Sequence, residues 1–99
     1  MKTREQILNF LAQNKQMFRA RFHIVRIGLF GSYARGDQNS VSDLDLLVEF
    51  EDGTENLYEL KLQIKDFFRS QLGLEVDICR EKYIKPRFKN SILKETVYA

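Results

Sequence analysis

The 99-residue sequence has little of several features that mark special classes of protein. Cys79 is its only cysteine, so no disulfide can form within the chain. One proline and five glycines leave no low-complexity linker and little sign of disorder. The longest apolar runs are far too short to cross a membrane, and the N-terminus lacks the apolar core of a signal peptide. We therefore expect a soluble, cytoplasmic protein made of a single domain, residues 1–99.

Charge is distributed unevenly along the chain, although the net charge is only +2. Residues 37–66 contain nine acidic and two basic side chains, whereas residues 80–99 contain six basic and two acidic ones. An acidic segment suits a metal site, and a basic segment suits an anionic ligand or partner. A candidate docking patch in the basic segment consists of Lys82, Lys85, Arg87 and Lys89. Ordinary solvated surface is the alternative interpretation of both segments.

Helical and strand patterns alternate along the sequence. Helices are predicted over about 3–18, from 57 to just before Gly73, and from Pro86 onward, and strands over 24–30, 43–50 and 74–79. Thr3 and Gln6 have the spacing of a capping box at the start of the first helix. Strands separated by helices predict an α/β sheet with helices packed mainly on one side.

Three aspartates are the candidate metal ligands. Asp43 and Asp45 are two residues apart on a predicted strand, so their side chains point to the same face. Magnesium prefers such oxygen ligands and is usually held by few carboxylates. Asp77 is the lone acid inside the apolar run of a later strand. If that strand neighbours the first, the three carboxylates converge, and such crowding is tolerable only with a cation or with shifted protonation.

A glycine-containing turn supplies candidate phosphate contacts. Gly31 and Ser32 lie between the first predicted strand and a short helical turn. A glycine allows the backbone to approach a phosphate closely, and the Ser32 hydroxyl adds a donor. Arg35, on the same turn, is suited to neutralising phosphate or pyrophosphate, although a solvated arginine is an equal alternative. A plain glycine turn with a capping serine is the structural alternative for the pair.

Taken together, the segments Gly-Ser-Tyr-Ala-Arg-Gly at 31–36 and Ser-Asp-Leu-Asp-Leu-Leu-Val at 42–48 resemble the minimal nucleotidyltransferase (MNT) family of the DNA polymerase β-like superfamily. Asp77 matches the third aspartate of the family pattern, and 92–98 resembles its ending. The resemblance implies an α+β fold with a small mixed sheet, and nucleotidyl transfer with two Mg²⁺ ions. Asp43, Asp45 and Asp77 would be the catalytic and metal-binding residues, while Gly31, Ser32 and Arg35 would bind the nucleotide.

The resemblance also implies a partner. Family members of this size typically act as antitoxins beside a HEPN-domain toxin, and some inactivate this ribonuclease by adenylylating a tyrosine. The leading hypothesis is therefore transfer of AMP from ATP to a HEPN partner, as in a type VII toxin–antitoxin pair, with no direct binding of nucleic acid expected. The alternatives are an antitoxin that neutralises its toxin by binding alone, and a nucleotidyltransferase acting on a small molecule such as an antibiotic.

Overall fold

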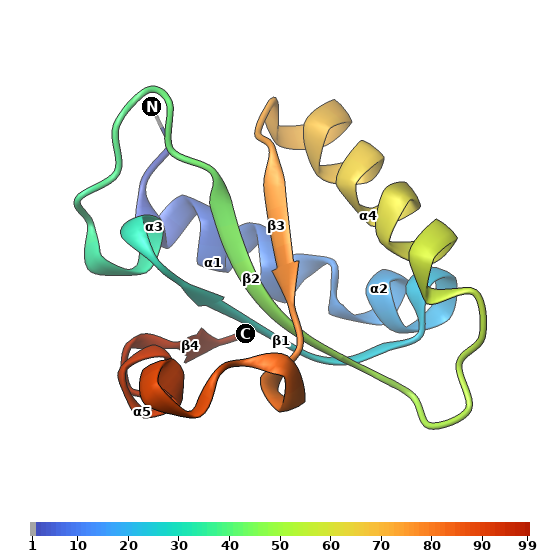
Figure 1. Ribbon diagram of the computed structural model, residues 1–99. Helices are drawn as coiled ribbons and strands as arrows, with labels where there is room; N and C mark the ends of the chain where they lie inside the picture. Colours follow the sequence, from blue (N-terminus) through green and yellow to red (C-terminus); the bar gives the residue numbers. More distant parts are fainter. Residues whose placement is uncertain (1) are drawn as a thin grey trace.

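The structure is a computed structural model that describes residues 2–99. Its elements in chain order are α1 (Arg4–Gln13), α2 (Lys15–Phe22), β1 (Ile24–Phe30), α3 (Ser32–Arg35), β2 (Leu44–Phe50), α4 (Leu57–Leu72), β3 (Val76–Cys79), the 3₁₀ helix η1 (Glu81–Tyr83), α5 (Pro86–Glu95) and β4 (Val97–Tyr98). They form an α+β fold around one four-stranded sheet, as predicted (Figure 1). No helix within these residues is long and apolar enough to span a membrane.

The sheet is mixed, with the strand order β3-β2-β1-β4. β1 pairs antiparallel with β2 and with β4, and β2 pairs parallel with β3. β4 is short and pairs with β1 only at Gly28 and Leu29. Gly28 is the residue that permits this pairing, because a Cβ there would lie 2.6 Å from Thr96 Cγ2 and 2.9 Å from Tyr98 Cδ1.

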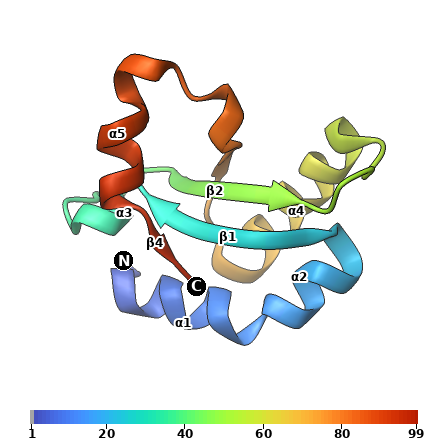
Figure 2. The same cartoon turned by 90° about the horizontal axis from the view of Figure 1, so that it is seen from below.

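The main core lies between the sheet and three helices. Figure 2 shows α1 and α2 on one side of the strands and α5 on the other. A cluster of phenylalanines with ring centroids 5.6–6.4 Å apart joins the helices to one another: Phe10, Phe18, Phe22, Phe67 and Phe68. The core face of β2 presents Leu44, Leu46 and Val48, all fully buried. Helices therefore cover mainly one face, as expected, and leave the other to α5, η1 and the predicted site.

The predicted N-terminal helix over 3–18 is in fact two helices. The capping box of Thr3 and Gln6 is present at the start of α1. Asn14 ends α1, and its side-chain Nδ2 donates to the Phe10 carbonyl at 2.8 Å. This local hydrogen bond competes with continuation of the helix. The apolar spacing from Leu11 to Phe18 continues across the break, which is why periodicity alone predicted one helix.

Two further elements were not predicted. β4 covers only two residues, so it is too short to show alternation. The 3₁₀ helix η1 follows β3 and contacts β2, and the amide of Glu81 donates to Glu49 Oε1 at 3.0 Å. Leu47 lies on the same face of β2 as Asp45, and it is buried. η1 and α5 lie on that side of the sheet, so the face that carries Asp45 is partly covered.

Candidate functional site

Sheet register places two of the predicted aspartates side by side. Asp45 on β2 is the register partner of Asp77 on the parallel strand β3, and of Phe30 on the antiparallel strand β1. Residues paired across neighbouring strands project to the same face of a sheet. Asp43 lies just before β2, two residues from Asp45, and is exposed. The strand of Asp77 thus neighbours that of Asp45, which is the condition on which the predicted meeting of the carboxylates depended.

The arrangement of the acidic side chains bears on the predicted metal site. Within residues 2–99, no group of three or more His, Cys, Asp or Glu side chains is positioned to hold a metal ion. The metal site made of Asp43, Asp45 and Asp77 stays a prediction, and the backbone brings these three residues to one edge of the sheet. Asp43 and Asp77 are exposed and Asp45 is half-buried.

Asp45 is the electrostatic centre of this site. Burial raises the pKa of Asp45 to about 6, and the nearby carboxylates of Asp77 and Asp43 add to this shift. Arg35 acts in the opposite direction. A half-buried carboxylate with two acidic neighbours is an environment that a divalent cation would stabilise. The donor set, made only of carboxylate oxygens, fits magnesium.

The raised pKa of Asp45 predicts how the stability of the free protein depends on pH. A carboxyl group whose folded-state pKa is raised contributes stability below its unfolded pKa of about 4, and this is lost as pH rises through about 6. The full shift would correspond to about 3 kcal/mol, which we discount to about 1 kcal/mol because the group is half-exposed. Denaturant unfolding at pH 4–7.5 should show this decline in wild type but not in Asp45→Asn. Parallel profiles for the two proteins would contradict it.

The Gly31 turn lies directly against Asp45. Gly31 has φ 76° and ψ −156°, a conformation that L residues rarely adopt. A Cβ at this position would overlap Asp45 Oδ2 and lie 2.9 Å from Asp45 Cγ. The turn continues into α3, which begins with the half-buried Ser32 and ends with the exposed Arg35. The turn and the carboxylates therefore form one continuous site.

Glu95 is a member of the site that sequence reasoning missed. The Gly31 amide donates to Glu95 Oε1 at 3.1 Å, and Arg35 Nη1 lies 3.1 Å from Glu95 Oε2. Arg35 Nε also donates to Asp37 Oδ2 at 3.1 Å. Glu95 is one of only two acids in the basic segment 80–99, which was the one available signal. Its contact with a turn 64 residues away depends on where α5 packs, and local patterns do not reveal that.

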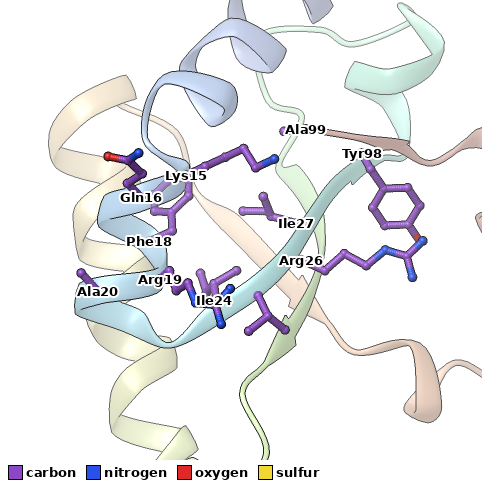
Figure 3. Close-up of a pocket in the computed structure, with 11 residues that line it drawn as sticks. Lys15, Gln16, Phe18, Arg19, Ala20, Ile24, Arg26, Ile27, Tyr98 and Ala99 are labelled. Atoms are coloured by element: carbon purple, nitrogen blue, oxygen red, sulfur yellow. The ribbon is translucent and has the colours of Figure 1, made fainter.

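A hollow of about 750 Å³ lies away from the carboxylates. Figure 3 shows it between α2, the first half of β1 and the end of the chain, with Ile24 and Ile27 toward its base and the Arg26 side chain extending toward the Tyr98 ring. The guanidinium carbon lies 3.9 Å from the centroid of that ring. None of the predicted site residues lines this hollow. The hollow is therefore not the candidate active site, because the predicted reaction requires carboxylates and donors for phosphate.

Comparison with known proteins gives matches over nearly the full chain. The profile of the nucleotidyltransferase domain family matches residues 5–99. Protein adenylyltransferase MntA of Thermococcus cleftensis is 37% identical over 98 residues, covering 99% of this chain and 97% of the relative. A proposed protein adenylyltransferase of Methanocaldococcus jannaschii is 35% identical over 99 residues, covering 99% of both chains.

Solved structures agree with this fold. The structure of a proposed minimal nucleotidyltransferase superposes with a TM-score of 0.76 at 33% identity, covering 97% of this chain and 95% of the other. A crystal structure described as a toxin–antitoxin with AMP-PNP has a TM-score of 0.67 at 22% identity, covering 88% of this chain and 69% of the other. At that identity, the second match supports the fold alone.

Proposed function

Because the chain belongs to the nucleotidyltransferase domain family, we propose that it transfers AMP from ATP to a tyrosine of a partner HEPN ribonuclease toxin. The observation that carries the proposal is the register of Asp45 with Asp77, beside a glycine turn that lies against Asp45. Relatives named protein adenylyltransferase support AMP as the transferred group and a protein as the acceptor. Neighbouring structures of the same fold are described as toxin–antitoxin complexes, and the toxin partner is proposed by analogy with them.

In the proposed reaction, an acceptor hydroxyl oxygen attacks the α-phosphorus of ATP. A bond forms between these two atoms, and the bond from the α-phosphorus to the oxygen that bridges the α- and β-phosphates breaks. Pyrophosphate leaves with that electron pair, and the hydroxyl proton passes to solvent. Negative charge grows on the leaving group, so donors that face the phosphates lower the barrier.

Each predicted residue has a role in this scheme. Asp43, Asp45 and Asp77 would hold magnesium, which when bound supplies positive charge to the phosphate and acceptor oxygens. Asp45 is paired with Phe30 on β1, next to the Gly31 turn, and with Asp77 on β3. It would therefore lie between the nucleotide and the acceptor. Gly31 and Ser32 would contact the triphosphate through the turn that precedes α3.

Arg35 is suited to neutralising the charge of the leaving pyrophosphate. Its exposed guanidinium is oriented by Asp37, and its positive charge lowers the pKa of Asp45. These two observations support the proposed role of Arg35 beside the phosphates.

The product released from ATP tests the type of reaction, independently of whether the partner is inactivated. Nucleotidyl transfer releases pyrophosphate, whereas phosphoryl transfer or simple hydrolysis of the terminal phosphate releases ADP. Incubation of the chain with ATP, magnesium and the HEPN protein should release one pyrophosphate for each acceptor modified. Release of ADP and phosphate instead would contradict nucleotidyl transfer.

A basic and aromatic surface next to the site is a candidate docking surface for the partner. It consists of η1 and the start of α5, with Lys82, Tyr83, Lys85, Arg87 and Phe88 exposed. η1 follows β3 after a single residue, so this surface is close in the chain to Asp77. Tyr83 is 69% exposed and Phe88 is 49% exposed, which supplies apolar contact area amid the positive charge.

Charge reversal should slow association with an acidic partner surface. The double variant Lys82→Glu with Lys85→Glu is expected to reduce the association rate about tenfold at low salt, with less effect at high salt because exposed charges are screened over about 8 Å at physiological ionic strength. Surface plasmon resonance at several salt concentrations measures this rate. The matched control is Lys15→Glu with Arg19→Glu, two exposed positions on α2. Equal association rates for the two double variants would show that the candidate docking surface does not contact the partner.

A further inference from the structure

One carboxylate occupies the donors that the proposed function assigns to phosphate. Glu95 Oε1 accepts from the Gly31 amide at 3.1 Å and lies 3.4 Å from Arg35 Nη1, and Glu95 Oε2 lies 3.1 Å from the same nitrogen. The Glu95 side chain is only 24% exposed, so its carboxylate is inserted between α5 and the Gly31 turn. A backbone amide and a guanidinium are the donor types that bind phosphate oxygens.

The end of α5 is an unfavourable place for the negative charge of Glu95. Glu95 is the last residue of α5, where the helix dipole disfavours negative charge. Its charge also acts on the carboxylate site, since Glu95 is among the groups that raise the pKa of Asp45. The contacts of Glu95 with Gly31 and Arg35 are the stabilising ones. They act against the unfavourable helix dipole and against repulsion from the Asp45 carboxylate.

A single amide hydrogen cannot serve two anions at full strength. Carboxylate and phosphate oxygens make the same charge-assisted hydrogen bonds, so they are alternatives at this position. We propose that Glu95 occupies the phosphate subsite of the free protein and competes with the triphosphate for the Gly31 amide and the Arg35 guanidinium. The proposal rests on the proposed function, because it requires nucleotide binding at the Gly31 turn.

The surrounding structure allows the exchange without rearrangement of the sheet. The backbone after Glu95 is held by β4, which pairs with Gly28 and Leu29, so the carboxylate leaves by rotation of its side chain. Arg35 keeps its second partner, because Arg35 Nε lies 3.1 Å from Asp37 Oδ2. The two donors therefore stay in place and oriented when the carboxylate withdraws.

Nucleotide affinity measures this competition directly. Calorimetric titration with Mg²⁺ and AMP-PNP, and separately with inorganic tripolyphosphate, compares wild type with Glu95→Gln. Gln keeps the shape of the side chain and loses its charge, so both ligands should bind about tenfold more tightly to the variant. Glu59→Gln removes the same charge from an exposed position on α4, and it should change affinity less than about twofold.

A second variant separates direct competition from general repulsion. Glu95→Asp keeps the charge but shortens the side chain by one methylene, so it should weaken the contact with Gly31 and give an intermediate gain in affinity. The amide resonance of Gly31 in ¹⁵N-labelled protein provides a readout that does not depend on activity. This resonance should differ between the free Glu95→Gln variant and free wild type. In wild type it should also shift when nucleotide is added.

The outcomes are distinguishable. Weaker binding to Glu95→Gln would overturn the competition and make Glu95 a positioning residue that supports the turn. Unchanged binding would overturn it as well. Tight binding to all variants without any shift of the Gly31 amide would place the phosphates elsewhere. Absence of binding to every protein, including wild type, would overturn the proposed nucleotide site itself and with it the competition.

Discussion

Asp77→Asn should reduce nucleotidyl transfer at least about a hundredfold while leaving the free protein as stable as wild type, or more so. Asp77 is exposed and lies in register with Asp45, so the substitution removes one of two facing negative charges at nearly constant shape. Relief of that repulsion favours the free protein. Loss of a proposed metal ligand should disable the acceptor side of the reaction, and such charge-stabilising groups are typically worth about 10²–10³ in rate.

Melting curves with and without Mg²⁺ and AMP-PNP measure both effects. A saturating ligand stabilises wild type by mass action, about 2.7 kcal/mol at a hundredfold excess over its dissociation constant, and the variant should lose much of this gain. Titration of Asp45 by NMR gives an independent readout, because its pKa should fall once Asp77 is neutral, while burial, the larger cause of the shift, still keeps it raised. Asp52→Asn, at an exposed position in the turn after β2, is the matched control. Lower stability of the free variant together with intact transfer would rule out a catalytic Asp77.

Gly31→Ala should reduce both stability and transfer strongly. The added Cβ overlaps the Asp45 carboxylate and adopts a backbone conformation that is nearly restricted to glycine, so we expect a loss of about 2–4 kcal/mol in the free energy of unfolding. Displacement of the Asp45 carboxylate should reduce transfer at least about a hundredfold. The direct cause is thus a collision within the protein, in addition to the close approach of phosphate expected from the sequence.

Gly73→Ala is a reference for adding a Cβ at a glycine with positive φ where there is no collision. Gly73 ends α4 with φ 68°, and no atom lies within 4 Å of a Cβ built there. It should therefore lose only about 1 kcal/mol from backbone strain and retain full transfer. Denaturant unfolding and the pyrophosphate assay compare the two variants. Equal losses in both would show that the contact between position 31 and Asp45 has no functional weight.

Sequence patterns predicted the features that depend on nearby residues. The pattern around Asp45 and Asp77 placed these two residues on strands, because side chains in a strand alternate with a period of two, whereas Asp43 lies one residue before the observed start of β2. The parallel pairing of β2 with β3 then set Asp45 against Asp77, as the sheet prediction required. The exact role of these residues, and the ions they bind, stays a prediction.

Features that depend on tertiary packing were not predictable in this way. The break at Asn14 results from a side-chain hydrogen bond that leaves the apolar periodicity unchanged. The contact of Glu95 with Gly31 requires α5 to cross the face of the sheet opposite to the main helices. Each depends on a specific side-chain contact, which composition and spacing do not encode.

Intact-mass spectrometry of the HEPN partner tests the central claim most directly. The partner is incubated with the purified chain, ATP and magnesium, and in parallel with the double variant Asp43→Asn with Asp45→Asn. Wild type should add the mass of one AMP unit to the partner, fragmentation of the modified peptide should locate it on a tyrosine, and the double variant should add nothing. A partner that is bound and neutralised by both proteins, with no gain in mass, would contradict AMP transfer and establish inhibition by binding alone.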